Sequence, residues 1–95
     1  MIRKEWSKLE KEISRFKVIV TEPGGRSSIE LVTWAFDASN ACKVSKLAYN
    51  KRNNRETWAY LETKASPSPE TKEGEIVPED NKCHVFYKGT LWRIS

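Results

Sequence analysis

Side chains that usually carry catalysis or bind metals are scarce in this chain of 95 residues. There is one histidine, His84, and the two cysteines, Cys42 and Cys83, are too far apart in the sequence to form a zinc-binding pair. The Pro-Gly-Gly stretch at 23–25 lacks the lysine and the spacing of a P-loop, so its glycines are turn residues. A lone histidine in a strand is more often a packing residue than a general base. We therefore expect a non-catalytic protein without a metal or another cofactor.

Long apolar runs are also missing. The longest is only a few residues, whereas a membrane-spanning helix needs about 20. The first residues, MIRKEWSKLEKE, lack the apolar core of a signal peptide, so we expect a cytoplasmic protein with no membrane partner. In that compartment two thiols are most often plain buried side chains, and a disulfide between Cys42 and Cys83 is the less common alternative.

Charges of both signs are abundant, but they are unevenly distributed. The formal net charge is +4, yet residues 62–80 hold six acids against two lysines and so carry a net charge of −4. The rest of the chain is correspondingly more basic. Such a separation can steer an anionic partner toward one face of a protein and away from another.

The most informative motif is a basic cluster at residues 43–55, KVSKLAYNKRNNR, which has five cations and no acid. Cations attract a phosphate backbone, asparagines can bond to it, and nearby aromatic rings can stack on unpaired bases. The cluster therefore indicates binding of nucleic acid or another acidic partner. The predicted contact residues are Lys43, Lys46, Asn50, Lys51, Arg52 and Arg55, with Trp58, Tyr60 and Trp92 as aromatic contacts. The plain alternative is an ordinary solvated helix end, where cations suit the helix dipole.

Periodic patterns predict the elements of the first half of the chain. Apolar residues at 2, 6, 9, 13 and 16 fall on one stripe of a helix, which we expect to dock on the core rather than to form a coiled-coil arm. The runs FKVIVTEP and SIELVTWAF predict a β-hairpin whose second strand, apolar on both faces, is central in the sheet. Asp37 is a good N-cap for a helix that starts at Ala38, with Lys43, Lys46 and Asn50 facing away from the sheet.

The second half is predicted to contain three strands and a loop. Residues 56–63, ETWAYLET, are typical of a strand with Trp58 and Tyr60 on one face. Residues 65–80 hold three of the four prolines and five of the thirteen acids, which predicts a mobile acidic loop. The segment CHVFYKGTLWRI predicts two short strands joined at Lys88 and Gly89, because glycine readily adopts the positive φ of a tight turn.

These elements predict a single α+β domain over residues 1–95, with a mostly antiparallel sheet of about five strands and two helices in the order α-β-β-α-β-β-β. Our first hypothesis is a non-catalytic protein that contacts nucleic acid through residues 43–55. The alternative is a protein-interaction module, such as an adaptor, regulator or inhibitor, that docks through an aromatic sheet face or the C-terminal hairpin.

The hairpin contains Tyr87, Trp92 and Arg93, which are residue types enriched at interfaces. Against an exposed role, we favour the alternative that Trp58 and Trp92 both cover the sheet under the first helix. The acidic loop is either a solvated linker or a shield for the basic cluster.

Overall fold

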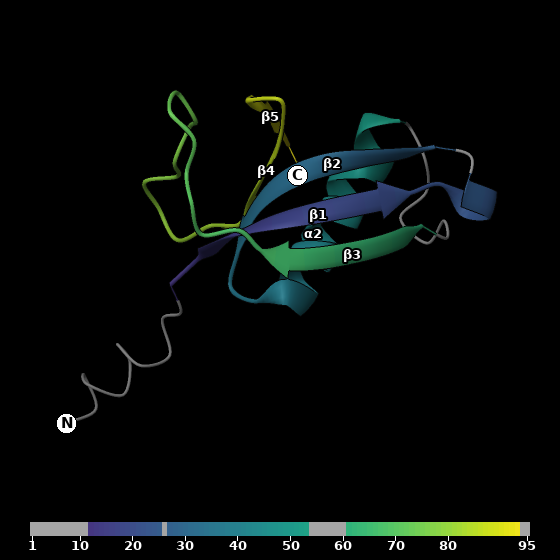
Figure 1. The fold of residues 1–95 in the computed structure, drawn as a ribbon, viewed down its shortest axis with the longest axis horizontal. Coiled ribbons are helices and arrows are strands. Elements are labelled where there is room, and N and C mark those ends of the chain that lie inside the picture. The colour runs from purple at the N-terminus through teal and green to yellow at the C-terminus, as the bar shows by residue number, and fades with distance from the viewer. Residues whose placement is uncertain (1–11, 26, 54–60, 94–95) are drawn as a thin grey trace.

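The computed structural model describes residues 12–25, 27–53 and 61–93 and shows a five-stranded sheet with a long helix across it (Figure 1). The sheet consists of β1 (Ser14–Thr21), β2 (Ser28–Ala35), β3 (Glu62–Pro67), β4 (His84–Tyr87) and β5 (Thr90–Trp92), and the helix is α2 (Ala38–Arg52). A short turn of 3-10 helix, η1 (Pro23–Gly25), joins β1 to β2. The α+β class is confirmed. The two helices and the full order are not, because α2 is the only α-helix among the described residues.

All neighbouring strands are antiparallel, in the order β3-β1-β2-β4-β5. The pairing of β1 with β2 runs from Ser14 opposite Ala35 to Thr21 opposite Ser28, which confirms the predicted hairpin. Strand β2 lies in the middle of the sheet, as its apolar character on both faces predicts. The two edges are β3 and β5, and β5 follows β4 after a tight turn at residues 88–89 in which both residues have positive φ.

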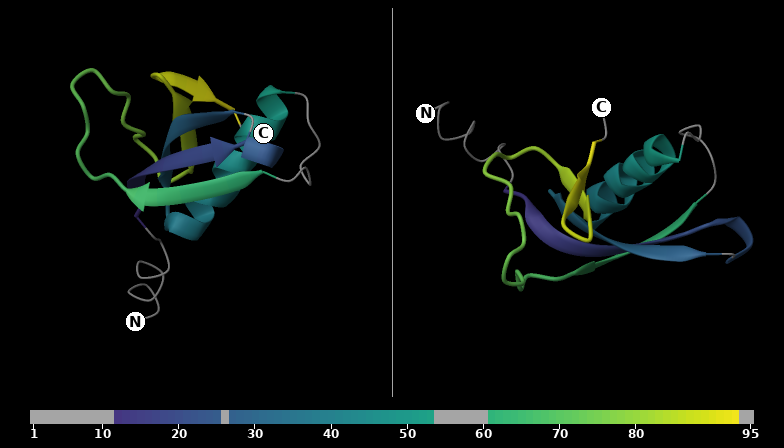
Figure 2. Two further views of the ribbon diagram at one scale, coloured as in Figure 1. Left: turned by 45° about the vertical axis from the view of Figure 1, so that its right-hand side comes forward. Right: turned by 90° about the horizontal axis from the view of Figure 1, so that it is seen from above.

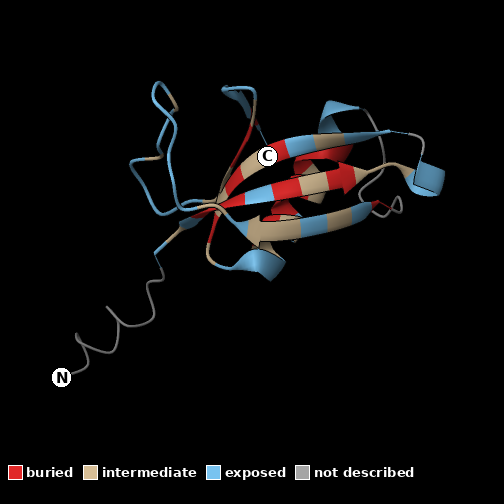
Figure 3. Ribbon diagram, in the orientation of Figure 1, coloured by how far each residue is buried: buried red, intermediate tan, exposed pale blue. Residues whose placement is uncertain are grey.

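Helix α2 covers one face of the sheet, so the protein has two layers (Figure 2). Phe16, Val18 and Val20 alternate along β1 toward the helix, and Leu31 and Val85 continue this buried layer on β2 and β4. Buried positions alternate with exposed or half-buried ones along β1 and β2, as Figure 3 shows. This period of two is the signature of strands with one face on a core.

Small residues let α2 lie close to the sheet. Ala41 and Ala48 are fully buried where the helix faces the strands. The hydroxyls of Thr33 on β2 and Ser45 on α2, both fully buried, form a hydrogen bond of 2.6 Å. This bond satisfies two polar groups that would otherwise be costly to bury.

Hydrogen bonds define both ends of α2. The side chain of Asp37 accepts a bond of 2.7 Å from the backbone N–H of Asn40, which confirms the predicted N-cap. At the other end, the backbone N–H and the side-chain amide of Asn53 both donate to the carbonyl of Tyr49. No helix among the described residues has the length and apolar character needed to cross a bilayer.

The helix predicted to run through position 16 is wrong at its C-terminal end. Strand β1 begins at Ser14, so Phe16 lies in the sheet. From Ser14 onward the chain pairs with β2 on one side, and from Phe16 also with β3 on the other, which satisfies its backbone groups between strands. Residues 1–11 lie outside the described residues, so the rest of that predicted helix stays a prediction.

The third strand extends further along the chain than predicted. Among the described residues it spans Glu62–Pro67, so positions 62–63 of the strand predicted over 56–63 are in it and position 61 is not, while positions 56–60 lie outside the described residues. Residues 65–67, predicted to be in the acidic loop, pair instead with β1. The strand has few apolar side chains, so pairing with β1 rather than its own pattern determines its position. Pro67 is tolerated because it stands at the end of an edge strand, where a missing N–H costs little.

Candidate functional site

Helix α2 carries four cations and no acidic residue. Lys43, Lys51 and Arg52 are exposed, and Lys46 is half-buried. Within the described part of the chain, none of the four forms an ion pair. The ion pairs found there are Arg15 with Glu75 and His84 with Asp80. Surface cations without carboxylate partners produce a positive local potential, which attracts anions.

Asn50 does not belong to this surface, and its predicted role is corrected. It lies four residues after Lys46 and seven after Lys43, so it shares their side of the helix. Its side chain is nevertheless fully buried, and neither atom of its amide has a hydrogen-bond partner among the described residues. A buried amide cannot reach a phosphate.

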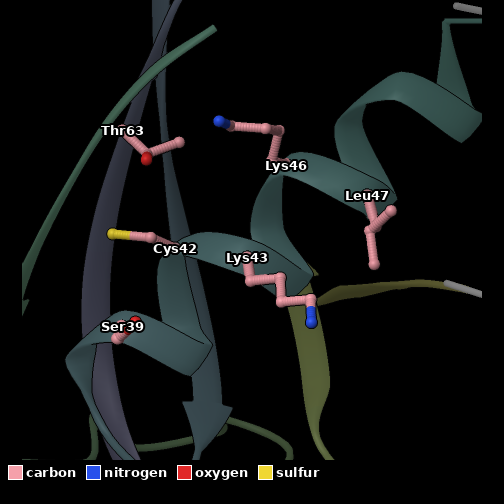
Figure 4. A pocket seen from close by; sticks show the side chains of 6 residues that line it. All are labelled: Ser39, Cys42, Lys43, Lys46, Leu47 and Thr63. Carbon is pink, nitrogen blue, oxygen red and sulfur yellow. The ribbon is translucent and has the colours of Figure 1, made fainter. Parts of the chain in front are cut away.

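A groove runs between α2 and the edge strand β3, which we call the α2–β3 groove (Figure 4). Its volume of about 430 Å³ lies in the range of small-ligand sites. The lining residues are Ser39, Cys42, Lys43, Lys46, Leu47 and Thr63. In Figure 4 the ammonium end of Lys46 points toward Thr63, the thiol of Cys42 points to the same side, and Lys43 turns away from Thr63. The described lining residues combine ammonium groups, hydroxyls and a thiol, and none of them is a carboxylate.

A second hollow, which we call the α2–β5 hollow, lies where the end of α2 meets β5. Its volume is about 410 Å³, and it is lined by Lys51, Arg52, Leu91, Trp92 and Arg93. Three cations therefore surround one depression, two from α2 and one from Arg93, which directly follows β5. The guanidinium carbon of Arg52 is 5.6 Å from the ring centroid of Trp92, within the range of a cation–π interaction.

Trp92 is part of the core rather than a stacking platform. Only 7% of it is exposed, and its ring lies 6.4 Å from that of Tyr49 and 5.2 Å from that of Tyr87. Tyr49 belongs to α2 and Tyr87 to β4, so this aromatic group holds the last hairpin against the helix. Trp92 therefore has a packing role, against α2 and β4 rather than under the predicted first helix, and little of the ring is available to a base.

Other predicted contacts are only partly testable. Arg55, Trp58 and Tyr60 lie outside the described residues, so their roles stay predictions. Conversely, the groove includes Ser39 and Thr63, which no sequence pattern marked as functional. They contribute because helix and strand meet there, a proximity that the order of residues does not reveal.

The acidic segment at 68–83 lies at the opposite end of the sheet from the C-terminal end of α2 (Figures 1 and 2). Glu75 forms a two-bond ion pair with Arg15, in which Nε donates to Oε2 at 2.8 Å. Arg15 also donates through Nη1 to the carbonyl (2.9 Å) and the hydroxyl (2.6 Å) of Ser68. The loop is thus fastened to the start of β1 and does not shield the cations of α2.

Asp80 and Cys83 have shifted pKa values, and neither residue lines the groove or the hollow. Nε2 of His84 is 2.9 Å from Oδ1 of Asp80, and this hydrogen bond holds the pKa of Asp80 below its ordinary value of 3.8. Both cysteines are free, and burial raises the pKa of Cys83, whose thiol donates to Asn40 at 3.1 Å. Among the described residues, no three His, Cys, Asp or Glu side chains gather into a metal-binding group.

The face of the sheet opposite α2 carries an apolar row. Val32, Phe86 and Leu91 are cross-strand neighbours on β2, β4 and β5; Leu91 is 42% exposed, Val32 is half-buried and Phe86 is buried. Trp34 lies two residues along β2 on the same face, and its indole N–H has no partner in the described ranges. This row is a second candidate surface, apolar rather than charged.

Comparison with known proteins assigns no function to these surfaces, since no family model, no curated protein and no solved structure matches the chain.

Proposed function

We propose that the protein binds nucleic acid through the cations at the C-terminal end of α2 and beside β5. The observation that carries this proposal is the convergence of Lys51, Arg52 and Arg93 on the α2–β5 hollow, with no ion-pair partner among the described residues. Clustered cations on one face are the usual electrostatic footprint of proteins that bind a phosphate backbone.

Stabilisation of the helix end explains only some of the cations on this side of the protein. The helix dipole favours Lys51 and Arg52, because both stand in the last turn of α2. Arg93 directly follows β5 and lies outside the helix, and Lys43 and Lys46 are too far from the helix end to benefit. An anionic partner gives all five cations a common role.

The test compares two double variants by fluorescence anisotropy with a labelled single-stranded oligonucleotide. Lys51→Gln with Arg52→Gln removes two proposed phosphate contacts. Lys17→Gln with Lys64→Gln removes the same charge from exposed positions on the opposite face of the sheet. If each lost contact contributes about 0.7 kcal/mol, a typical value for an exposed ion pair, the first variant should bind roughly tenfold more weakly.

Salt dependence adds an independent readout. The slope of log affinity against log salt should fall by about 1.4 in the first double variant, because each phosphate contact on a single strand contributes about 0.7. The control should keep the wild-type slope, and circular dichroism should show that both variants are folded. Equal losses in the two variants, or no binding by the wild type at low salt, would rule the proposal out.

The apolar row of Val32, Phe86 and Leu91 supports a second candidate, a protein-interaction module that docks through the outer face of the sheet. Leu91→Ser removes the most exposed member without opening the core. For this candidate, capture of a protein partner from a nuclease-treated lysate should decrease in Leu91→Ser. Undiminished capture would remove this face from consideration.

A further inference from the structure

We propose that the α2–β3 groove binds a backbone phosphate of the nucleic acid, and that the bound nucleic acid is single-stranded. This inference deepens the proposed function and rests on it. It assigns a second contact point, on the other flank of α2 from the α2–β5 hollow, and it specifies the class of nucleic acid.

The groove has the donors that a phosphodiester requires. The ammonium group of Lys46 points toward Thr63, whose hydroxyl lies on the opposite wall, and the hydroxyl of Ser39 lies further along the groove (Figure 4). Lys43 stands at the rim, where rotation of its flexible side chain can bring a second ammonium group to the same anion. Among the described residues that line the groove there is no carboxylate to repel a phosphate or to compete for these donors.

The groove and the hollow can be joined by one flexible strand. From Lys46 to Lys51 the helix rises about 7.5 Å, at 1.5 Å per residue. The α2–β3 groove opens on the side of β3 and the α2–β5 hollow on the side of β5, so the connecting path crosses the helix. A few nucleotides of single strand are long and flexible enough to follow such a path.

The burial of Asn50 favours a single strand over a duplex. A helix that reads duplex DNA enters a major groove about 12 Å wide and needs its outward side exposed to the base edges. Asn50 lies on the same side of α2 as Lys43 and Lys46, and it is fully buried. In its second half, therefore, α2 does not present this side to a duplex groove, whereas its two flanks remain hollow and cationic.

Cys42 provides a direct readout of the occupied groove in the wild-type protein. Its thiol lines the groove, whereas Cys83 bonds to Asn40 and lines neither the groove nor the hollow. Alkylation by iodoacetamide can be followed separately at the two cysteines by peptide mass spectrometry. A single-stranded oligothymidylate about ten nucleotides long, within the usual range of site sizes, should slow alkylation of Cys42 as it binds and leave Cys83 unchanged.

A matched pair of variants tests the contact itself. Lys46→Gln should weaken binding of the oligothymidylate and lower the salt slope by about 0.7, the value for one phosphate on a single strand. Lys64→Gln removes the same charge one residue from Thr63, but on the outer face of the sheet, so it should bind as the wild type does.

The outcomes separate this inference from the proposed function. If the oligothymidylate binds but neither protects Cys42 nor responds to Lys46→Gln, the groove is not a phosphate site, although nucleic-acid binding stands. If the oligothymidylate does not bind at all, both proposals fail. Equal protection of Cys42 by a duplex of the same length would overturn the single-strand assignment, and equal protection by inorganic phosphate at the same phosphate concentration would reduce the groove to a general anion site.

Discussion

Replacing Glu75 with glutamine removes the negative charge that neutralises Arg15 but keeps the size of the side chain. The side chain of Arg15 is 5% exposed and that of Glu75 is 20% exposed, so the guanidinium would stay buried without its counter-charge. Removing one member of a buried ion pair typically costs about 3–5 kcal/mol. Glu75 is partly exposed, and the glutamine side chain keeps one oxygen that can still accept a hydrogen bond from Arg15. Both reduce the cost, so we expect the free energy of unfolding to fall by about 2–3 kcal/mol. That is a large share of the about 5–14 kcal/mol usual for 95 residues.

Urea denaturation followed by tryptophan fluorescence measures this loss. With a slope of about 1 kcal/mol per M, the midpoint should fall by roughly 2–3 M. Glu73→Gln is the matched control, because it removes the same charge from an exposed position in the same loop and should change stability by less than about 0.5 kcal/mol. If Glu75→Gln is as mild as Glu73→Gln, the ion pair does not fasten the loop, and our explanation of its position is wrong.

Three further predictions concern the helix and the histidine. Ser45→Ala leaves the buried hydroxyl of Thr33 unpaired and should lower the free energy of unfolding by about 1–3 kcal/mol. Adding Thr33→Val removes the unpaired hydroxyl and should restore part of that stability, whereas an unchanged stability of Ser45→Ala would contradict the hydrogen bond. Asp37→Ala removes the N-cap and should cost about 1 kcal/mol in the same assay, and an unchanged midpoint would refute that role. The hydrogen bond from His84 lowers the pKa of Asp80 in the folded state, so the stability that it contributes is fully present above the ordinary pKa of 3.8 and is lost as pH falls through the lowered pKa. The wild type should therefore be more stable than His84→Gln at about pH 5 and lose this advantage at about pH 2.

Features with a local physical cause could be predicted from the sequence. The β1–β2 hairpin follows from two β-forming runs around a Pro-Gly-Gly turn, and the helix start follows from the capping chemistry of Asp37. The last hairpin follows from the positive φ that Gly89 readily adopts. In each case the residues that determine the feature are neighbours in the chain.

Features determined by pairing between distant segments could not be predicted. Strand β3 is mostly polar, and its place depends on the edge that β1 offers to it. The ion pair of Arg15 with Glu75 joins residues sixty positions apart, so the acidic composition of the loop gave no hint of its attachment. Asn50 was misplaced for a related reason, since helical periodicity gives the side of a helix but not what covers it.

The same distinction applies to the candidate site. The cations of α2 form a run that is visible in the sequence, and Lys43, Lys51 and Arg52 are exposed as a contact role requires. The convergence of Arg93 with Lys51 and Arg52 depends on the packing of β5 against the helix, which the aromatic group around Trp92 maintains. Composition therefore indicated the charge, whereas tertiary structure determined where it gathers.

An NMR titration of the isotopically labelled protein with a single-stranded oligothymidylate tests the central claim most directly. Binding through the cations of α2 should shift the backbone amide signals of Lys46, Lys51, Arg52 and Arg93, and these shifts should weaken as salt is added. Signals from the outer sheet face, such as that of Lys64, should stay in place. Shifts confined to the outer face, or no shifts at low salt, would contradict the assignment of nucleic-acid binding to this surface.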